Sequence, residues 1–551
     1  MHERWPLWVA VGVGAAWLGY APAAAALTDK QRLEKLERHM LDLERRLEAS
    51  EAENAKLRAQ QAAPVAGGKV AGAAGTTAAS APDVKALDQK VRLIERKLEV
   101  DKENTDAKWA KLPKVELGSQ GLKVESADGN NTLYLRSTLQ ADARFYVDDN
   151  GSTPTNTNGD DLNDQFLIRR ARLTLEGTLW KYIDYRVMPD FAGAQARLFD
   201  AYVDFRPLQE VSLTAGKYKA PISLERLQSA SALSFNERAF PTQLAPNRDL
   251  GFMLHGEFDK PGYAKYKHSF PLFMYPEFFS YQLAVVNGAG NNNGDATGDI
   301  NDPKEFEGRV FAHPFQHMGI EQLEGLGLGV AGSWGDTNDE SLPTYVTPGQ
   351  NTMFSYASSA KADGVHTRIY PQMYWNYGPF GLIGEYAISD QELASQSVKN
   401  NVSVNKYQTT TNDRAWNLTL LYVLTGEDNV FLNQGIKPRH IFDPFKGHWG
   451  AFQLAARWTE MDFDKAVFLN TGTAAKPVYP LADPRSSVSS ASSWALGVNW
   501  WLNNNVKFMA NYNQTEFDGG AGVYSSAGSQ TPQIRDRQTE KVFMTRFQVS
   551  F

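Results

Sequence analysis

The sequence contains no cysteine and, after its first twenty residues, no long uninterrupted apolar run. The first absence excludes disulfide bonds, thiolate metal sites and a cysteine nucleophile. The second excludes further transmembrane helices, because a helix needs about 20 apolar residues to cross a bilayer. Fifty-six basic and 63 acidic side chains leave a net charge of −7, which argues against a nucleic-acid partner.

Catalytic and metal-binding motifs are also missing. The nine histidines lack the H-E-x-x-H spacing of a metal site, and neither a G-x-S-x-G elbow nor a phosphate-binding P-loop occurs. Asp295, Thr297 and Asp299 could contact a cation such as calcium, but a solvated loop is the more economical interpretation. The sequence therefore predicts no enzyme, no cofactor and no structural metal.

The first 26 residues have the layout of a secretory signal peptide. Arg4 is followed by an uncharged apolar stretch from Trp5 to Tyr20 and then by the small residues Ala23 to Ala26. This order predicts export and cleavage near Ala26. An uncleaved inner-membrane anchor is the alternative.

Two segments with heptad spacing follow, at residues 27–60 and 83–110. In the second, Val84, Leu87, Val91, Ile94 and Leu98 alternate steps of three and four, as the a and d positions of a coiled coil do. Residues 61–82 between them are almost entirely small and read as a flexible linker. We expect an oligomeric periplasmic coiled coil, with a solvated spacer helix as the alternative.

From residue 114 to 551 the period of the pattern changes to two. From Leu133 to Val147 one parity is apolar, whereas the other carries Arg136, Gln140, Asp142 and Arg144. Strands with one apolar and one polar face suit a barrel with lipid outside and water inside. The same alternation recurs along the chain, and it predicts an all-β fold, a transmembrane antiparallel β-barrel of about sixteen strands. A soluble β-sandwich is the alternative, but the long strands lack a second apolar face.

The connections and the last strand also favour an outer-membrane barrel. Tight turns such as Gly378-Pro379 alternate with long polar loops, including the one expected at residues 392–412. The chain ends on an alternating strand in which Phe543, Phe547 and Phe551 share one parity. A terminal phenylalanine on such a strand resembles the signal that directs bacterial barrels into the outer membrane.

Short motifs in one consistent order carry a family resemblance. They are Asp128-Gly129-Asn130, Ile168 to Leu173, Gly216 to Pro221, Arg248 to Gly251, Leu424 to Glu427 and Ala455 to Trp458. Together they resemble the phosphate-selective porin O and P family over residues 115–551. The resemblance implies a homotrimer of sixteen-stranded barrels whose third loop folds into each lumen. It also implies that basic side chains line the pore, and that the coiled coil is an extension which only some related porins share.

On this basis we expect one set of pore-lining residues and one set in a constriction loop. The pore-lining set has inward parity: Arg136, Arg144, Arg170, Arg172, Arg186, Arg457 and Arg546. Arg169 takes the outward parity. The constriction loop runs from Ala220 to Asn247 and supplies Glu225, Arg226, Glu237 and Arg238, with Arg248 at its end. These charges either meet solutes, because guanidinium binds phosphate and carboxylate well, or pair with one another and fix the loop to the wall.

The inward charges as a whole lean toward cations. Ten inward residues are basic and eight are acidic. The basic ones are the seven predicted pore-lining arginines together with Arg309, Arg368 and Lys507. The acidic ones are Asp142, Glu176, Asp190, Asp200, Asp204, Glu257, Glu307 and Glu385. Cross-strand pairing can neutralise most of them. We therefore expect a water-filled outer-membrane channel for passive uptake of small solutes, leaning toward anions such as phosphate. The alternatives are a nonselective diffusion pore, and a structural anchor whose coiled coil binds the cell wall while the barrel contacts outer-membrane lipid.

Overall fold

The computed structural model describes residues 81–147, 162–258, 278–288, 302–399, 402–431, 435–473, 476–524 and 533–551. The predicted signal peptide, the first coiled-coil segment, most of the linker and the candidate cation loop around Asp295 lie outside these residues. The chain divides into two compact units, residues 1–99 and residues 100–551.

The second predicted coiled-coil segment is a helix, α2 (Ala81–Trp109). Three of its heptad positions are solvent-exposed in the single chain, with exposed fractions of 46% at Val91, 60% at Ile94 and 64% at Leu98. The sequence of α2 mixes polar and apolar residues. Among the described residues, no helix has the length and apolar character needed to cross a bilayer.

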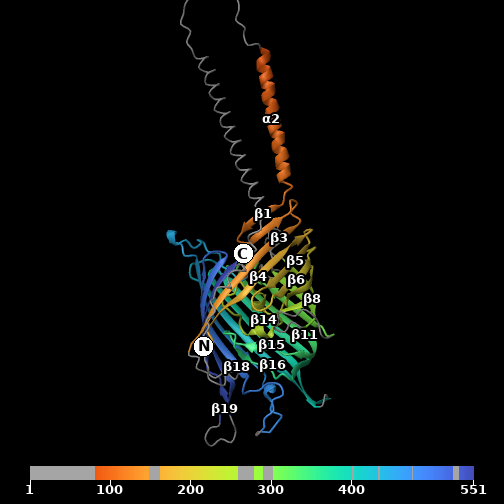
Figure 1. Ribbon diagram of the computed structural model, residues 1–551, viewed down its shortest axis with the longest axis vertical. Coiled ribbons are helices and arrows are strands. Elements are labelled where there is room, and N and C mark those ends of the chain that lie inside the picture. The colour runs from red at the N-terminus through yellow and green to blue at the C-terminus, as the bar shows by residue number, and fades with distance from the viewer. Residues whose placement is uncertain are drawn as a thin grey trace, which may run out of the picture. The chain divides into compact units, whose positions relative to one another are not determined.

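Sixteen of the described strands form a closed antiparallel barrel (Figure 1). The barrel closes where the last strand pairs with the first, with Phe543 opposite Phe145 and Phe547 opposite Ala141. The expected strand number is thus confirmed. The strands are β3 (Thr132–Tyr146), β4 (Gln165–Leu179), β5 (Ile183–Asp190), β6 (Arg197–Phe205), β7 (Ser212–Lys219), β8 (Arg248–Phe258), β9 (Phe279–Val286), β10 (Glu305–Ala312), β11 (Leu326–Ser341), β14 (Ala360–Tyr377), β15 (Phe380–Lys399), β16 (Val402–Val423), β17 (Ala451–Asp462), β18 (Val488–Trp501), β19 (Val506–Tyr524) and β21 (Glu540–Ser550).

The period of two in the sequence is the physical basis of the barrel wall. On β3 the inward Gln140, Asp142 and Arg144 are buried, whereas the outward Leu139 is 47% exposed. On β21 the outward Phe547 is 49% exposed, and the inward Arg546 is fully buried. The apolar face therefore points away from the lumen on both strands that close the barrel, as a lipid-facing wall requires.

The chain also forms shorter strands and helical turns outside the sixteen barrel strands. The hairpin of β1 (Lys114–Gly118) and β2 (Gly121–Glu125) continues the wall at the start of β3, with Leu122 opposite Leu135. β20 (Gln533–Asp536) pairs with β19, and β12 (Tyr345–Val346) pairs with β13 (Thr352–Phe354) in the loop before β14. The remaining short helical turns are α3 (Leu224–Leu227), α4 (Pro241–Leu244), α5 (Glu321–Glu324), η1 (Pro444–Lys446) and η2 (Lys465–Phe468).

One expected loop is instead a long hairpin. Residues 392–412 were expected to be irregular, but β15 continues to Lys399 and β16 starts at Val402. Threonine and valine are frequent in this stretch, and these β-branched residues favour extended backbone even where both faces are polar. The prediction was wrong because polarity was taken as a sign of irregular structure.

The apolar core lies inside the barrel, where loops fill part of the lumen. The loop after β7 places Ile222 and Phe240 against Phe354 and Leu481, which come from the loops after β11 and β17, and all four are at most 1% exposed. Phe354 also stacks on Phe463, with ring centroids 4.0 Å apart. Three loops from one end of the barrel thus form a shared core, which fixes the loop after β7 in position.

Candidate functional site

The segment Ala220–Asn247 folds into the lumen as a constriction loop. Side chains of the barrel wall hold its backbone from several strands. Lys507 Nζ donates to the Leu233 carbonyl at 2.8 Å, Arg457 Nη2 to the Glu237 carbonyl at 2.8 Å, and Arg368 Nε to the Leu244 carbonyl at 3.0 Å. These donors come from β19, β17 and β14, so they fix the loop to the β14–β19 side of the wall, and Gln140 Nε2 of β3 also donates to the Ala230 carbonyl at 3.0 Å.

Glu237 is the electrostatic centre of the constriction loop. Its carboxylate accepts two hydrogen bonds from Arg169, at 2.6 and 3.0 Å, and one from Arg144 at 3.2 Å. Arg546 lies 3.9 Å away and makes its own pair of 2.7 Å bonds to Asp142. Burial alone would raise the pKa of Glu237, but the neighbouring Arg169 guanidinium holds it below its ordinary value. Glu237 is thus a buried carboxylate that stays charged.

Arg169 was expected on the outward face, and this expectation is wrong. Its side chain reaches Glu237 in the lumen because the register of β3 against β4 shifts at this point. Gln140 lies opposite Arg170 but Ala141 lies opposite Ile168, so that Arg169 is the extra residue of a β-bulge. A bulge redirects the side chain of the inserted residue, and here it turns two consecutive arginines toward the lumen.

Four of the seven predicted pore-lining arginines lie under the constriction loop or against it. Arg144 and Arg546 belong to the Glu237 group, and Arg457 pairs with Glu225 at 3.3 Å. Arg170 is 3% exposed, and its Nη1 donates to Gln140 Oε1 at 2.6 Å. These four side chains are inward, as their parity predicts, but they hold the loop and the wall together.

The two basic residues inside the loop, Arg226 and Arg238, bond to carbonyls of the loop itself. Arg238 donates to the carbonyls of Glu225 and Gln228, both at 2.9 Å, and Arg226 donates to the carbonyl of Thr242. Burial and the neighbouring Arg226 guanidinium lower the pKa of Arg238 to about 9. Of the two interpretations of these charges, the contacts agree with fixation of the loop to the wall, but among the described residues the carboxylates Glu225 and Glu237 pair with the wall residues Arg457 and Arg169 and not with the loop arginines.

A ribbon of alternating charge remains on the opposite wall, from β3 to β8. Glu176 joins Arg136 and Arg186, each at 3.0 Å, and Asp200 joins Arg186 at 3.2 Å and Arg248 at 2.7 Å. Arg172 pairs with Asp190 at 2.7 Å. Each carboxylate holds one or two guanidinium groups in position without covering them, since Arg136, Arg172 and Arg186 keep 12–23% of their side chains exposed.

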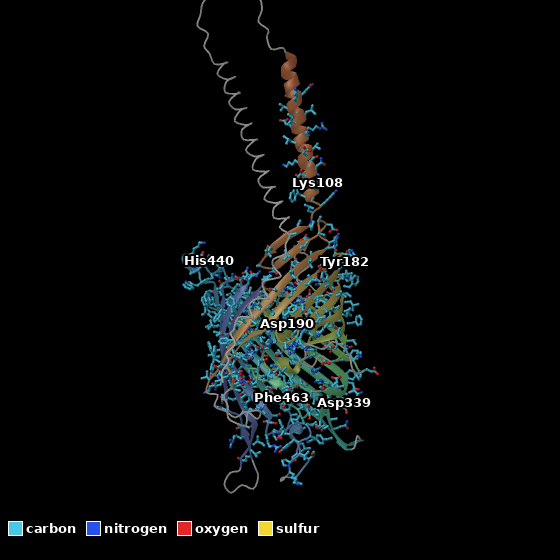
Figure 2. All side chains as sticks on the ribbon, in the orientation of Figure 1. Lys108, Tyr182, Asp190, Asp339, His440 and Phe463 are labelled. Carbon is cyan, nitrogen blue, oxygen red and sulfur yellow. The ribbon has the colours of Figure 1, made fainter. Side chains whose placement is uncertain are left out.

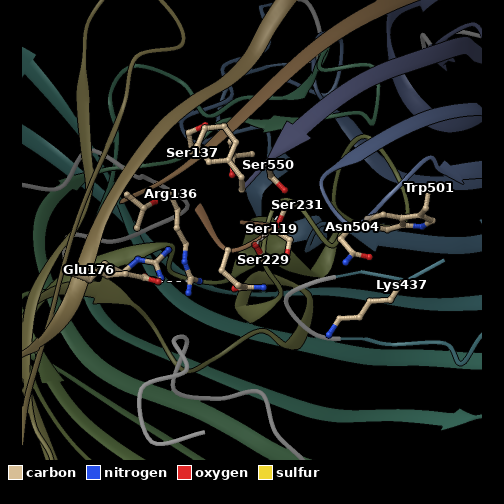
Figure 3. A pocket seen from close by; sticks show the side chains of 15 residues that line it. Ser119, Arg136, Ser137, Glu176, Ser229, Ser231, Lys437, Trp501, Asn504 and Ser550 are labelled. Carbon is tan, nitrogen blue, oxygen red and sulfur yellow. Dashed lines mark hydrogen bonds and ion pairs between the residues drawn. The ribbon is translucent and has the colours of Figure 1, made fainter. Parts of the chain in front are cut away.

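Two adjoining cavities separate this wall from the constriction loop. The larger, of about 160 Å³, is lined by Arg136, Glu176, Arg186 and Lys437 together with hydroxyl groups (Figure 3). The smaller, of about 90 Å³, is lined by Arg172, Arg186, Lys219 and Arg248. They share five lining residues, Thr138, Thr174, Arg186, Ser229 and Ser231. We call this space the β3–β8 passage.

Basic side chains outnumber carboxylates along the passage. Its lining and the partners of that lining supply six basic side chains, namely Arg136, Arg172, Arg186, Lys219, Arg248 and Lys437, and three carboxylates, namely Glu176, Asp190 and Asp200. Ser229 and Ser231 add hydroxyl donors from the constriction loop (Figure 3). The described residues contain no group of three or more potential metal ligands.

Sequence reasoning missed Lys437 and the two loop serines, and it left open whether Lys219 points inward, because a bulge near it would redirect its side chain. Lys437 belongs to the loop between β16 and β17, which lies at the end where short turns were expected. The first part of this loop enters the barrel, where the carbonyl of Phe431 accepts a bond from Gln228 Nε2 at 2.6 Å. The length of the segment from Leu424 to Gly450 was the available signal, because it is too long for a tight turn.

Comparison with known proteins agrees with this architecture. The family model of phosphate-selective porin O and P matches residues 139–551. The chain belongs to that family. It is therefore an outer-membrane channel.

Individual relatives are distant. Porin O of Pseudomonas aeruginosa is 24% identical over 438 residues, which cover 72% of this chain and 86% of the relative. An anion-selective porin from Comamonas acidovorans is 11% identical, with a TM-score of 0.43 over 76% of this chain and 100% of the other. The trimer form of OmpT from Vibrio cholerae is also 11% identical, with a TM-score of 0.42 over 76% of this chain and 99% of the other.

Proposed function

We propose that the protein admits small anionic solutes such as phosphate by passive diffusion along the β3–β8 passage. The observation that carries this proposal is the excess of six basic side chains over three carboxylates along the passage. Membership of a family named for phosphate selectivity supports it. A channel needs no catalytic group, which agrees with the lack of catalytic motifs.

The arrangement of the charges suits transport better than tight binding. Guanidinium groups donate paired hydrogen bonds to phosphate or carboxylate oxygens. Glu176 and Asp200 compete with a solute for the same donors, so they weaken binding at each point along the wall. A solute must leave each site for conduction to occur, and several weak sites in a row meet that need. The local field of the passage, rather than the net charge of −7, sets the preference for anions.

The direct test removes two cations of the larger cavity. In the double variant Arg136→Gln/Lys437→Gln we expect the preference for chloride over potassium to fall to near unity, since both side chains face the same space. The measurement is the zero-current potential under a potassium chloride gradient. Lys361→Gln, at a half-buried position near the start of β14 and outside the lining of both cavities, is the control. A cation-selective wild type, or an unchanged double variant, would contradict the proposal.

We infer that the protein is a homotrimer held mainly by its barrels, with α2 as a periplasmic coiled coil. The exposed heptad positions Val91, Ile94 and Leu98 support a helical partner for α2. With few heptads, α2 adds only a marginal interface of its own. Residues that contact outer-membrane lipid are the outward apolar ones of the strands.

Removal of residues 27–110 tests this assignment. We expect the truncated barrel to keep its conductance and to migrate as a trimer in mild detergent without boiling. Monomers from this truncation would show that the coiled coil is the main determinant of trimerisation. Loss of envelope integrity with unchanged conductance would favour the alternative role of the coiled coil as a cell-wall tether.

A further inference from the structure

The loop between β16 and β17 has a second part that points away from the lumen. Residues 439–449, which we call the rim tip, follow the inward Lys437. In Figure 1 this loop is the blue segment that projects sideways from the barrel rim, at the end where β1 lies. Figure 2 labels His440 there, on the flank of the barrel opposite Tyr182.

The rim tip is a folded structure with its own hydrogen bonds. The amide of Asp443 donates to the carbonyl of His448 at 2.9 Å, and the amide of His448 returns a bond to Asp443 at 3.0 Å. Asp443 also caps η1 by accepting from the amide of Phe445 at 3.2 Å. Gly447 closes the turn with a φ of 72°, and the rings of His440 and His448 stack 4.5 Å apart. These hydrogen bonds and the stacked rings therefore give the projecting tip a defined conformation.

The apex presents large apolar side chains to the surroundings. Phe445 is 99% exposed, Ile441 60% and Trp449 56%. Phe445 is the most exposed large apolar residue of the described chain. An exposed apolar group on a projecting, well-folded turn is typical of a surface that contacts another apolar phase.

The base of the tip is continuous with the lipid-facing wall. Phe442 packs edge-on against Trp500, with ring centroids 5.3 Å apart, and Trp500 stacks on Phe452 at 5.6 Å. Trp500 Nε1 donates to the carbonyl of Trp449 at 2.6 Å. These aromatic residues lie at the ends of β17 and β18, where the outward Leu454 and Val498 are each 41% exposed. Aromatic rings at strand ends mark the interface between the hydrocarbon and the headgroups.

The charges of the tip suit phospholipid headgroups. Lys446 keeps 72% of its side chain exposed and also pairs with Asp443 at 3.0 Å, so the acidic group of the tip is compensated. Arg439 is exposed and bonds the carbonyl of Gly426. Basic side chains beside exposed aromatic and aliphatic ones are the combination found on segments that lie in a membrane interface.

We propose that the rim tip is a membrane-interface anchor. It inserts Phe445 and Ile441 into the phospholipid leaflet at the end of the barrel where β1 lies. Arg439 and Lys446 contact the lipid phosphates. The tip lies outside the β3–β8 passage, so this role is separate from transport.

The absence of cysteine in the chain allows a site-specific test on the full-length protein. Phe445→Cys is labelled with the fluorophore NBD and reconstituted into vesicles of phosphatidylethanolamine and phosphatidylglycerol. We expect a nitroxide on the lipid acyl chains to quench this probe several-fold more than a probe at Ala127→Cys. Ala127 is the matched control, because it is exposed on the turn between β2 and β3. Iodide is present on both sides of the membrane, and we expect it to quench the probe at Ala127→Cys more strongly than the probe at Phe445→Cys.

Two outcomes would overturn the proposal. Strong quenching by iodide at position 445 with none by the nitroxide would place the tip in water. Protection from both quenchers, in vesicles and equally in detergent, would show that a neighbouring copy of the chain covers the tip. The role of the basic residues is tested by adding Arg439→Gln/Lys446→Gln to Phe445→Cys. We expect reduced nitroxide quenching, and unchanged quenching would contradict the contact with lipid phosphates.

Discussion

At the scale of single residues, the main finding is that inward arginines divide into two groups with different contacts. Arg144, Arg170, Arg457 and Arg546 bond the constriction loop or the neighbouring wall, whereas Arg136, Arg172 and Arg186 remain partly exposed beside the passage. Parity alone places all of them in the lumen. It does not distinguish the two groups, because the difference depends on where the 28-residue constriction loop, which is distant in sequence from most of these arginines, packs in the lumen.

Glu237→Gln is the substitution that tests the loop contacts. It removes the charge that pairs with Arg169 and Arg144, and breaking a buried pair from one side costs about 3–5 kcal/mol. We expect the folded barrel to unfold at lower temperature and its single-channel conductance to rise and become noisier, because the loop is less firmly held. Glu516→Gln, on an exposed position of β19, is the control. Conductance and thermal stability equal to those of the control would show that Glu237 does not hold the loop.

At the scale of elements, the sequence predicts what depends on local periodicity. The strand number, the antiparallel barrel and the inward and outward faces agree with the structure. The entry of the loop after β7 agrees as well, but it was implied by the family resemblance and not by periodicity. The bulge at Arg169 was not predictable, since one extra residue leaves the apolar alternation on either side intact. The same holds for the inward path of the β16–β17 loop, which depends on tertiary contacts of Phe431 and Ile436.

Phe431 fixes the inner part of that loop by aromatic stacking. Tyr374 stacks on Phe431 at 4.9 Å and on Phe311 at 5.4 Å, and its hydroxyl lies 2.7 Å from His313 Nε2. Phe431→Ala removes one member of this stack, and we expect a larger conductance with weaker anion preference, because a wider lumen dilutes the field of its wall. Phe445→Ala, in the exposed tip of the same loop, is the control for conductance in planar bilayers. Equal effects of the two substitutions would contradict a specific role of the stack.

At the scale of the whole molecule, the barrel is asymmetric in cross-section. Loops from both ends fill the side bounded by β14–β19, whereas the cavities lie against β3–β8. A chain with a net charge of −7 can therefore still offer anions a passage in which positive groups prevail. This preference should weaken at high ionic strength, since the Debye length falls to about 3 Å at 1 M salt.

The most direct measurement asks which half of the lumen carries the current. Single cysteines are introduced into the cysteine-free chain at Thr138, which lines both cavities, and at Thr515, an inward residue of β19 that is 1% exposed. A negatively charged methanethiosulfonate reagent is then added during single-channel recording. The account predicts rapid, stepwise block of the Thr138→Cys channel and no effect on Thr515→Cys. Block of Thr515→Cys alone, or of neither variant, would contradict a solute path along β3–β8.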